Sequence, residues 1–414
     1  MFEELFEDQR TIARHKSAPY QEERRRYLTH CAEQGYAPLS LVSLAEELLW
    51  VVRSFEAYPD LRVNPDQIKV AAAKWVRNRW RHGRLRHGKA AYKHFRGTAT
   101  QWLRFLGRLI PNKAPTRFQA LLDDYTRWMD QERGLTSQTV AMECSSIEPF
   151  LRWYETKRQS LSEIQAADID AYMKVCGDKG WARSTMARFA TTLRCFFRYA
   201  SAQGQCPSSM VEAVISPRVY QNESLPQGPT WEEVRRLLAS MDTDRPRDIR
   251  DRAMAMLFAI YGLRASEVSG LCLEDIHWEQ DHIQIARAKR GGMRTYPLIP
   301  VVGNAILRYL QQVRVKCPRR ELFLTLTIPH RRLARSSLHK VVAPRLQALG
   351  VRSPHRGPHC LRHACATHLV SEHFSLKEIG DHLGHHHPSS TRTYAKVDLA
   401  GLRQVAAFDL GGLL

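Results

Sequence analysis

Apolar residues recur at helical spacing along most of the chain, and the clearest series of such patterns lies between residues 115 and 212. Four patterns follow one another there, and glycines end three of them, at Gly134, Gly177 and Gly204. The first pattern keeps one apolar face through Phe118, Leu121, Leu122, Tyr125, Trp128 and Met129. The sequence therefore predicts a small bundle of four helices in this region.

Proline, serine and glycine gather between residues 207 and 230, a composition that is typical of a linker. A new domain begins at Thr230, because its hydroxyl and the carboxylate of Glu233 can each satisfy a free N–H group at a helix start. From Arg252 to Leu263 the pattern is helical and almost entirely apolar. We therefore expect this helix at the centre of the last domain.

Residues 282–288 alternate apolar and polar side chains, and a second short run, 294–298, follows Gly291 and Gly292. Two such runs around a glycine-containing turn predict a β-hairpin. The remainder, to about Ala407, is helical again. The predicted fold class is therefore mainly α, with a small antiparallel β-sheet in the last domain.

These patterns divide a chain of 414 residues, which is long enough for two to three domains. We predict a basic helical N-terminal domain over 1–114, a four-helix domain over 115–212, a linker over 213–229 and a mixed α/β domain over 230–414.

The net charge of the chain indicates which class of binding partner to expect. Lysine and arginine number 62 against 42 aspartates and glutamates, a net charge of +20. Such an excess favours nucleic acid first and an acidic membrane surface second. The longest apolar run, Ala253 to Leu263, is about half of what a bilayer needs, so we expect no membrane partner. With no secretory signal and no C-x-x-C pair among nine cysteines, we expect a cytoplasmic protein.

Positive charge is densest between residues 69 and 96, and no acidic residue occurs between Asp66 and Asp123. Aromatic residues such as Trp75 and Tyr92 are interleaved with the basic ones. Such a stretch is either a solvated face of a helical domain or, as we favour, a surface that follows phosphates. The predicted DNA-binding residues are Lys74, Arg77, Arg79, Arg81, Arg84, Arg86, Lys89, Lys93 and Arg96.

Two polar positions in the last domain suggest chemistry. Arg264 closes the most hydrophobic helix, where a buried guanidinium needs an anion, and Glu267 is one helical turn away. Lys289 lies at the hairpin tip, from which it can reach a phosphate or protonate a leaving group. The competing interpretations are an internal arginine–glutamate ion pair and an exposed lysine without function.

Two further stretches follow near the end of the chain. His359 and Arg362 are three residues apart, so an imidazole and a guanidinium share one helix face. His385 follows a Leu-Gly pair, and Tyr394 comes nine residues later. Taken alone, such a tyrosine is usually a packed aromatic residue.

A zinc site competes for the histidines, because His355, His359 and His363 are spaced four residues apart. However, no glutamate occupies the H-E-x-x-H position, and Arg362 among the ligands would repel a dication. We therefore predict no metal.

The order of these polar residues along the chain resembles the active site of the tyrosine recombinases, the phage integrase family. The residues are Arg264, Lys289, His359, Arg362, His385 and Tyr394. Residues 262–267 look like the first arginine motif of that family. Residues 359–363 with 366–369 match its second motif, and 383–385 with the spacing to Tyr394 match its last. The resemblance is specific because four motifs occur in the same order.

The resemblance is close over about 250–400 and looser over 115–212, which is similar to the helical, SAM-like core-binding domain of that family. Over 1–114 we recognise no resemblance. Ala288 and Arg290 stand where the family often has glycines around its lysine. Arg290 and Arg294 are therefore alternatives to Lys289, and residues 386–388 lengthen the polar turn after His385.

The resemblance and the chemistry of the residues together imply phosphoryl transfer. A tyrosine phenolate forms far more easily than an alkoxide, so Tyr394 is the expected nucleophile. Arg264 and Arg362 can donate paired N–H groups to the phosphate oxygens, which makes a metal unnecessary.

The remaining roles complete the predicted mechanism. We expect His359 to accept the tyrosine proton and His385 to hydrogen-bond the phosphate, while the resemblance implies that Lys289 protonates the leaving 5′ oxygen. Glu267 would orient Arg264 or His359.

The predicted function is therefore a site-specific DNA recombinase, an integrase of a mobile element, acting through a 3′-phosphotyrosine without metal, cofactor or ATP. The alternatives are a type IB topoisomerase, which relaxes strands, and a non-catalytic DNA-binding protein of the same fold. The expected partners are double-stranded DNA target sites, further copies of the chain, which form a homotetramer in the synapse, and accessory DNA-bending proteins.

The resemblance implies that the tail after Tyr394 packs on a neighbouring protomer. The alternative is a helix folded back on its own domain.

Overall fold

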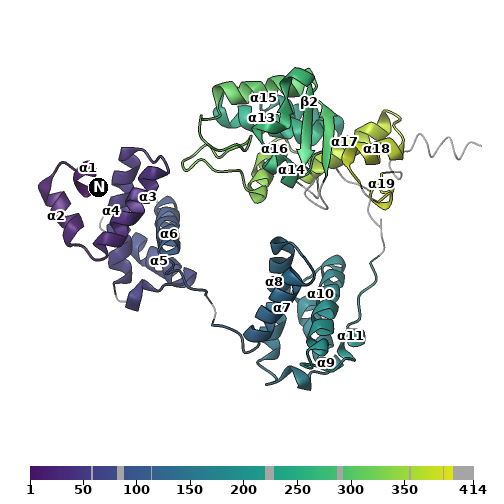
Figure 1. Ribbon diagram of the computed structural model, residues 1–414, viewed down its shortest axis with the longest axis horizontal. Helices are drawn as coiled ribbons and strands as arrows, with labels where there is room; N and C mark the ends of the chain where they lie inside the picture. Colours follow the sequence, from purple (N-terminus) through teal and green to yellow (C-terminus); the bar gives the residue numbers. More distant parts are fainter. Residues whose placement is uncertain are drawn as a thin grey trace, which may run out of the picture. The chain divides into compact units, whose positions relative to one another are not determined.

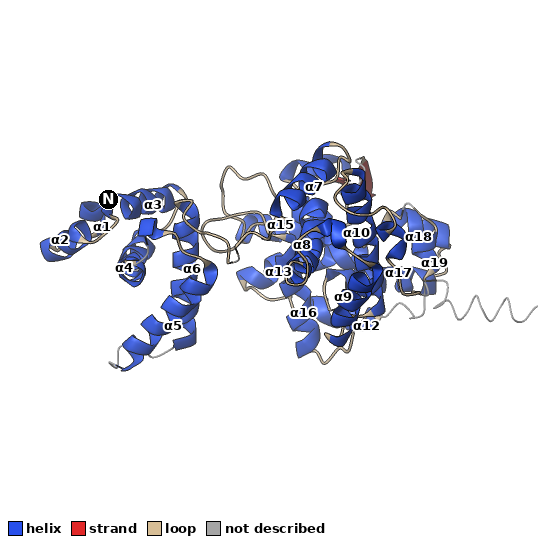
Figure 2. Cartoon of the chain, turned by 90° about the horizontal axis from the view of Figure 1, so that it is seen from below, coloured by secondary structure: helices blue, strands red, loops and turns tan. Residues whose placement is uncertain are grey.

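The computed structural model describes residues 1–56, 59–81, 88–112, 114–219, 228–286, 292–353, 356–385 and 387–394. Helices make up most of these residues, and the strands are confined to the C-terminal region (Figures 1 and 2). The predicted fold class, mainly α with one small antiparallel sheet, is confirmed. The domain boundaries stay predictions, so each region is described by itself. Among the described residues, no helix is both long and apolar enough to cross a membrane.

The N-terminal region is helical, as predicted. Its helices are α1 (Phe2–Leu5), α2 (Gln9–Ser17), α3 (Gln21–Glu33), α4 (Pro38–Phe55), α5 (Pro65–Arg81) and α6 (Gly88–Phe105), with a 3-10 turn at Pro59–Leu61. Trp75 of α5 lies against Phe95 of α6, with ring centroids 5.2 Å apart. Glu47 of α4 is buried and accepts hydrogen bonds from the Thr98 hydroxyl, at 2.6 Å, and from the His94 ring.

The middle region contains the four predicted helices: α7 (Gln119–Gln131), α8 (Ser137–Tyr154), α9 (Ala166–Asp178) and α10 (Arg183–Ala202). A 3-10 turn (Leu161–Glu163) precedes α9, and a short helix, α11 (Met210–Ala213), follows α10. Aromatic side chains form the core; Tyr125, for example, meets Phe196 edge-on at 5.3 Å. Arg194 of α10 donates two hydrogen bonds to the Val214 carbonyl, which ties the chain after α11 to the bundle.

The C-terminal region contains the remaining helices and the strands of the described residues. Its helices are α12 (Trp231–Ala239), α13 (Pro246–Ile260), α14 (Ala265–Gly270), α15 (Pro300–Gln312), α16 (His339–Ala348), α17 (Pro358–Ser371), α18 (Leu376–Leu383) and α19 (Ser389–Arg392). Its 3-10 turns are Leu273–Asp275, Trp278–Gln280 and Arg335–Leu338, and its strands are β1 (Ile276–His277), β2 (His282–Ala286) and β3 (Met293–Pro297).

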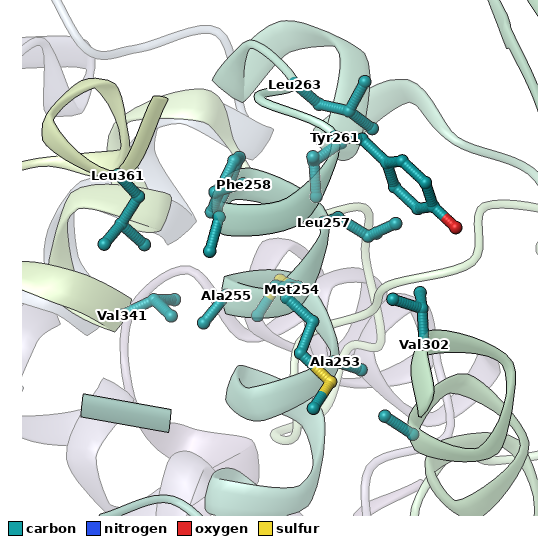
Figure 3. Packing of buried hydrophobic residues seen from close by; sticks show 14 of the residues in the cluster. Ala253, Met254, Ala255, Leu257, Phe258, Tyr261, Leu263, Val302, Val341 and Leu361 are labelled. Atoms are coloured by element: carbon teal, nitrogen blue, oxygen red, sulfur yellow. The ribbon is translucent and has the colours of Figure 1, made fainter. Parts of the chain in front are cut away.

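Helix α13 lies at the centre of this region, as its apolar sequence predicts. Every residue from Ala253 to Ala259 is buried. Figure 3 shows Val302 of α15, Val341 of α16 and Leu361 of α17 packed around it. The helix starts at Pro246, six residues before the predicted start at Arg252. The prediction began too late because the first turns of the helix are polar and do not belong to the apolar pattern.

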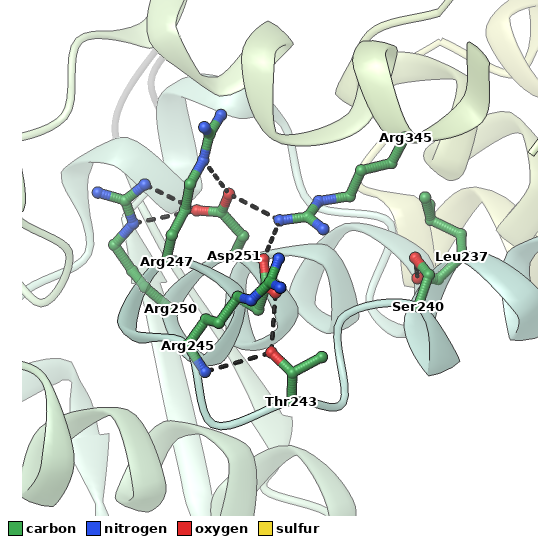
Figure 4. Close-up of polar contacts among 9 residues, drawn as sticks. Leu237, Ser240, Thr243, Arg245, Arg247, Arg250, Asp251 and Arg345 are labelled. Atoms are coloured by element: carbon green, nitrogen blue, oxygen red, sulfur yellow. Dashed lines mark hydrogen bonds and ion pairs between the residues drawn. The ribbon is translucent and has the colours of Figure 1, made fainter. Parts of the chain in front are cut away.

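The polar first turns of α13 carry a buried ion-pair network. Asp251 is fully buried, and the Arg250 guanidinium donates to its Oδ1 at 2.8 and 3.1 Å. Arg345 of α16 donates to Asp248 at 2.6 Å and to Asp251 at 3.5 Å, and Arg247 also pairs with Asp251 (Figure 4). A carboxylate this deeply buried requires such partners. The network therefore fixes α16 against α13.

The predicted β-hairpin is confirmed, with β2 and β3 antiparallel and Gln284 opposite Thr295. A two-residue strand, β1, extends the sheet in the order β1-β2-β3; it was not predicted, because two residues carry no visible alternation. The hairpin tip, residues 287–291, lies outside the described residues, and so does the tail after Tyr394.

Candidate active site

Arg264 is positioned by the turn that leaves α13. Gly262 adopts a φ of +59°, and a β-carbon there would lie 2.3 Å from Leu383 Cδ2, so only glycine fits. Arg264 then caps α14, where its backbone N–H donates to Glu267 Oε2 at 2.7 Å and its Nη1 to Oε1 at 2.9 Å. Nη2 donates to the Gly384 carbonyl at 3.2 Å. Glu267 is buried, so it holds the guanidinium in one orientation.

Arg362 lies on α17 and is 2% exposed. Its guanidinium donates to the carbonyls of Gly262 and, at 2.7 Å, of Leu383. Burial first, and then the positive charge of Arg264, lower the pKa of Arg362 to about 10, so it stays charged at neutral pH. In the described part of the chain no carboxylate forms an ion pair with it. Two neighbouring guanidiniums with a single carboxylate between them form a site for an anion.

Tyr394 follows α19 and is 2% exposed. Burial raises the pKa of its phenol to about 12, although the charge of Arg362 opposes this. Its hydroxyl is 2.8 Å from His363 Nδ1, in a hydrogen bond. The tyrosine therefore lies inside the same site as the two arginines.

His385 lies beside Tyr394, with parallel rings whose centroids are 6.5 Å apart. Its Nδ1 is 2.7 Å from the hydroxyl of Thr391. Burial first, and then the charges of Arg362 and Arg264, lower the pKa of His385 to about 4. The ring is therefore neutral at pH 7, as a hydrogen-bonding group for a phosphate can be.

His359 is exposed on α17, one turn before Arg362 and one turn before His363. Its ring meets that of His363 edge-on, with centroids 4.5 Å apart. Of the six residues predicted to be catalytic, the structure thus brings five together from four separate stretches: Arg264, His359, Arg362, His385 and Tyr394. Lys289 and its alternative Arg290 lie outside the described residues.

Arg294, the other alternative to Lys289, has its guanidinium engaged by α18. It donates to the carbonyl of Asp381, to that of His382 at 3.1 Å, and to the Tyr296 hydroxyl at 2.9 Å. A β-carbon at Gly384 would lie 2.4 Å from Arg294 Nη1, so the guanidinium packs directly against the turn that carries His385. Arg294 therefore anchors that turn.

Sequence reasoning gave no catalytic role to His363. Its place four residues after His359 was visible, and the zinc interpretation used it, but nothing in the spacing shows which side chain it touches. Among the described residues, no cluster of three or more histidine, cysteine or acidic groups has a metal-binding arrangement; His355 and His386 fall outside them.

The predicted DNA-binding residues lie on α5 and α6 and between them. Lys74, Arg77, Lys89, Lys93 and Arg96 are exposed. Arg79 and Arg81 belong to α5, and Arg84 and Arg86 lie outside the described residues.

Comparison with known proteins identifies the family. The family model described as "Phage integrase family" matches residues 230–400, and that of the phage integrase N-terminal SAM-like domain matches 122–204. The integrase/recombinase y4rA of Sinorhizobium fredii is 35% identical over 297 residues, which cover 70% of this chain and 71% of y4rA. The chain belongs to the phage integrase family.

Other members of the family agree with this assignment. Tyrosine recombinase XerD of Listeria innocua is 29% identical to this recombinase over 69% of the chain and 96% of XerD. The crystal structure of the XerH site-specific recombinase bound to a palindromic difH substrate has a TM-score of 0.55 at 18% identity, covering 84% of this chain and 98% of XerH. A lambda integrase dimer bound to a core site has a TM-score of 0.52 at 19% identity, covering 66% and 94%.

The predicted function and enzyme class are confirmed by this membership: the chain is a site-specific recombinase that acts through a tyrosine. The topoisomerase and non-catalytic alternatives are not favoured. The SAM-like match over 122–204 lies within residues 115–212, where the looser resemblance was found.

Proposed function

We propose that Arg264, His359, Arg362, His385 and Tyr394 form the site at which this recombinase cleaves and rejoins DNA. One observation carries the proposal: the buried Tyr394 hydroxyl shares a site with two guanidiniums, and among the described residues a single carboxylate, that of Glu267, forms an ion pair with either of them. A nucleophile beside unneutralised positive charge is the arrangement that attack on a phosphodiester requires.

In the cleavage step, the Tyr394 oxygen attacks the phosphorus and the 5′ oxygen leaves, which produces a 3′-phosphotyrosine. The equatorial oxygens gain negative charge as the bonds change. Arg264 and Arg362 stabilise this charge, and the backbone contacts that hold them in place mean that little reorganisation is needed during the reaction. His385 donates a further hydrogen bond to the phosphate, and Lys289 protonates the leaving oxygen, as the resemblance to the family implies.

The proposed substrate is double-stranded DNA. The solved XerH and lambda integrase structures contain DNA sites, which supports this assignment. Exposed cations also lie on α5 and α6 of the N-terminal region. Because each cation placed on a phosphate releases a counterion, these residues contribute affinity without reading sequence.

We further infer that the protein is a cytoplasmic, nucleoid-associated integrase of a mobile element and takes part in transposition. It works as a tetramer in which the C-terminal tail is exchanged between protomers. Accessory DNA-bending proteins assist it. The relative y4rA, named as an integrase/recombinase, and the dimer formed by lambda integrase on its core site support these inferences.

Tyr394→Phe tests the proposal. Because it removes one hydroxyl and keeps the ring, the variant should bind DNA normally and form no covalent adduct. The substrate is a nicked duplex drawn from a randomised pool by covalent capture on the wild-type protein, and adducts are counted on denaturing gels. Adduct formation by the variant at the wild-type rate would remove Tyr394 from the mechanism.

A further inference from the structure

The Tyr394 hydroxyl has a defined partner, and that partner is not His359, the proton acceptor expected from the sequence. His363 Nδ1 is 2.8 Å from the phenolic oxygen, within ordinary hydrogen-bond distance. A candidate general base must lie within this reach of the proton that it removes. His363 meets this condition before any DNA is bound.

The other two histidines at the site, His385 and His359, have different contacts from those of His363. His385 lies parallel to the tyrosine ring at 6.5 Å, and its Nδ1 is engaged by Thr391. With a pKa of about 4 it is a weak base. His359 is exposed, and its ring meets that of His363 edge-on.

The helix that carries His363 is packed against α12 and the residues just before it. Gly228, just before α12, packs so closely on α17 that a β-carbon there would lie 3.1 Å from the Ala364 nitrogen and 3.3 Å from His363 Cβ. Trp231 of α12 stacks on His368 of α17 at 4.1 Å. The backbone of α17 at His363 is therefore held by packing, as the support of a residue that must keep one nitrogen on the tyrosine needs to be.

We propose that His363 is the catalytic proton acceptor for Tyr394, in place of His359. This proposal rests on the proposed function. As the bond from the Tyr394 oxygen to phosphorus forms, the phenolic O–H bond breaks and its proton passes to the lone pair of His363 Nδ1. The bond from phosphorus to the 5′ oxygen breaks, and that oxygen takes a proton from a separate acid, the role assigned to Lys289. In strand joining the tyrosine oxygen leaves phosphorus and takes the proton back from His363.

This step requires neutral His363 with its own proton on Nε2, so that Nδ1 is the acceptor. Titratable groups in contact with it include His359 on α17 and Tyr394 after α19. The charged Arg362 precedes it on α17, and His385 lies beside Tyr394.

The test compares His363→Gln with His359→Gln on the captured nicked duplex. Glutamine keeps a polar group near Tyr394 but accepts no proton at neutral pH. We expect His363→Gln to form adduct about 100-fold more slowly at pH 7, the usual worth of a general base, with unchanged DNA affinity. Its rate should rise with pH where the wild-type rate levels off, because hydroxide replaces the lost base. His359→Gln should be slower but keep the wild-type shape of the pH profile.

Two further measurements separate a base from a structural residue. Imidazole added to His363→Ala should restore adduct formation in proportion to its neutral form, whereas it should not help Tyr394→Phe. On a duplex with a bridging 5′ sulfur at the mapped cleavage position, which needs no acid, the deficit of His363→Gln should persist.

The proposal fails if His363→Gln cleaves within threefold of wild type with the same pH profile. It also fails if the bridging sulfur abolishes the deficit, or if only His359→Gln loses the pH plateau. Failure of the proposed function is distinguishable, because the wild-type protein would then capture no duplex at all.

Discussion

Arg24 in the N-terminal region and Arg362 in the C-terminal region are both buried, and both donate hydrogen bonds to backbone carbonyls. Arg24 on α3 is fully buried and donates to the carbonyls of His15, Ala18 and Pro19 at 2.6, 3.0 and 3.1 Å. Arg362 on α17 is buried on two carbonyls in the same manner. Burial lowers the pKa of both guanidiniums to about 10.

What differs is the second influence on each arginine. Beside Arg24 it is the carboxylate of Glu23, which stabilises the positive charge. Beside Arg362 it is Arg264, which opposes that charge. Burial alone therefore does not mark an arginine as functional. A buried arginine next to a second one, with a nucleophile in the same site, does.

The largest expected effect comes from Arg362→Met, which removes the positive charge and keeps most of the volume. Adduct formation should fall by 100-fold or more, on the order of 3 kcal/mol or more of barrier, because a preorganised charge is lost. Its loss of stability should be smaller than that of the matched Arg24 variant, because removing Arg362 also removes the repulsion by Arg264. Single-turnover rates that stay near wild type would place Arg362 with Arg24, as a structural residue.

Arg24→Met is the matched variant in the N-terminal region. It should lower the free energy of unfolding by about 2–3 kcal/mol, because the carbonyls at the turn between α2 and α3 lose charged donors. Hydrogen exchange should increase across α2 and α3, while the adduct rate per molecule of bound protein stays unchanged. A catalytic loss as large as that of Arg362→Met would end the contrast between the two arginines.

A smaller effect is expected from the exposed cations of the N-terminal region. Replacing Lys74, Lys89 and Lys93 with glutamine should weaken DNA binding and reduce the slope of log K against log salt by up to about 2.7, or about 0.9 for each phosphate that the variant no longer neutralises. The cleavage rate of saturated complexes should not change. Equal slopes for the variant and the wild type would mean that these lysines bind no phosphate.

The smallest effect concerns the pH dependence of stability. Unfolded chains protonate histidine near pH 6.5, whereas folded His385 stays neutral until about pH 4. The unfolded state therefore binds more protons in this window, and stability should fall as the pH decreases from about 6.5 to about 4. His385→Gln should lose less stability over that interval in thermal unfolding. Identical pH profiles would mean that this burial does not affect stability.

Much of the fold could be predicted from short-range pattern. The capping boxes are examples: Thr230 with Glu233, and Ser375 with Glu378, form as reciprocal hydrogen bonds at the starts of α12 and α18. The pairing of Arg264 with Glu267 was also predictable, since the two are one helical turn apart. In each case the partners are three residues apart, so local helix geometry alone brings them together.

The sequence by itself determined the helical faces, the hairpin and the order of the chemical residues, because spacing within a helix or strand decides each of these. Only the tertiary structure decided that the carbonyl of Gly262 holds Arg362, and that the Tyr394 hydroxyl meets His363 rather than His359. Those partners are 100 and 31 residues apart, and the packing of α13, α17 and α18 sets their distances. Both histidines lie on α17, and no periodicity distinguishes which ring nitrogen comes within 2.8 Å of a tyrosine contributed by another segment.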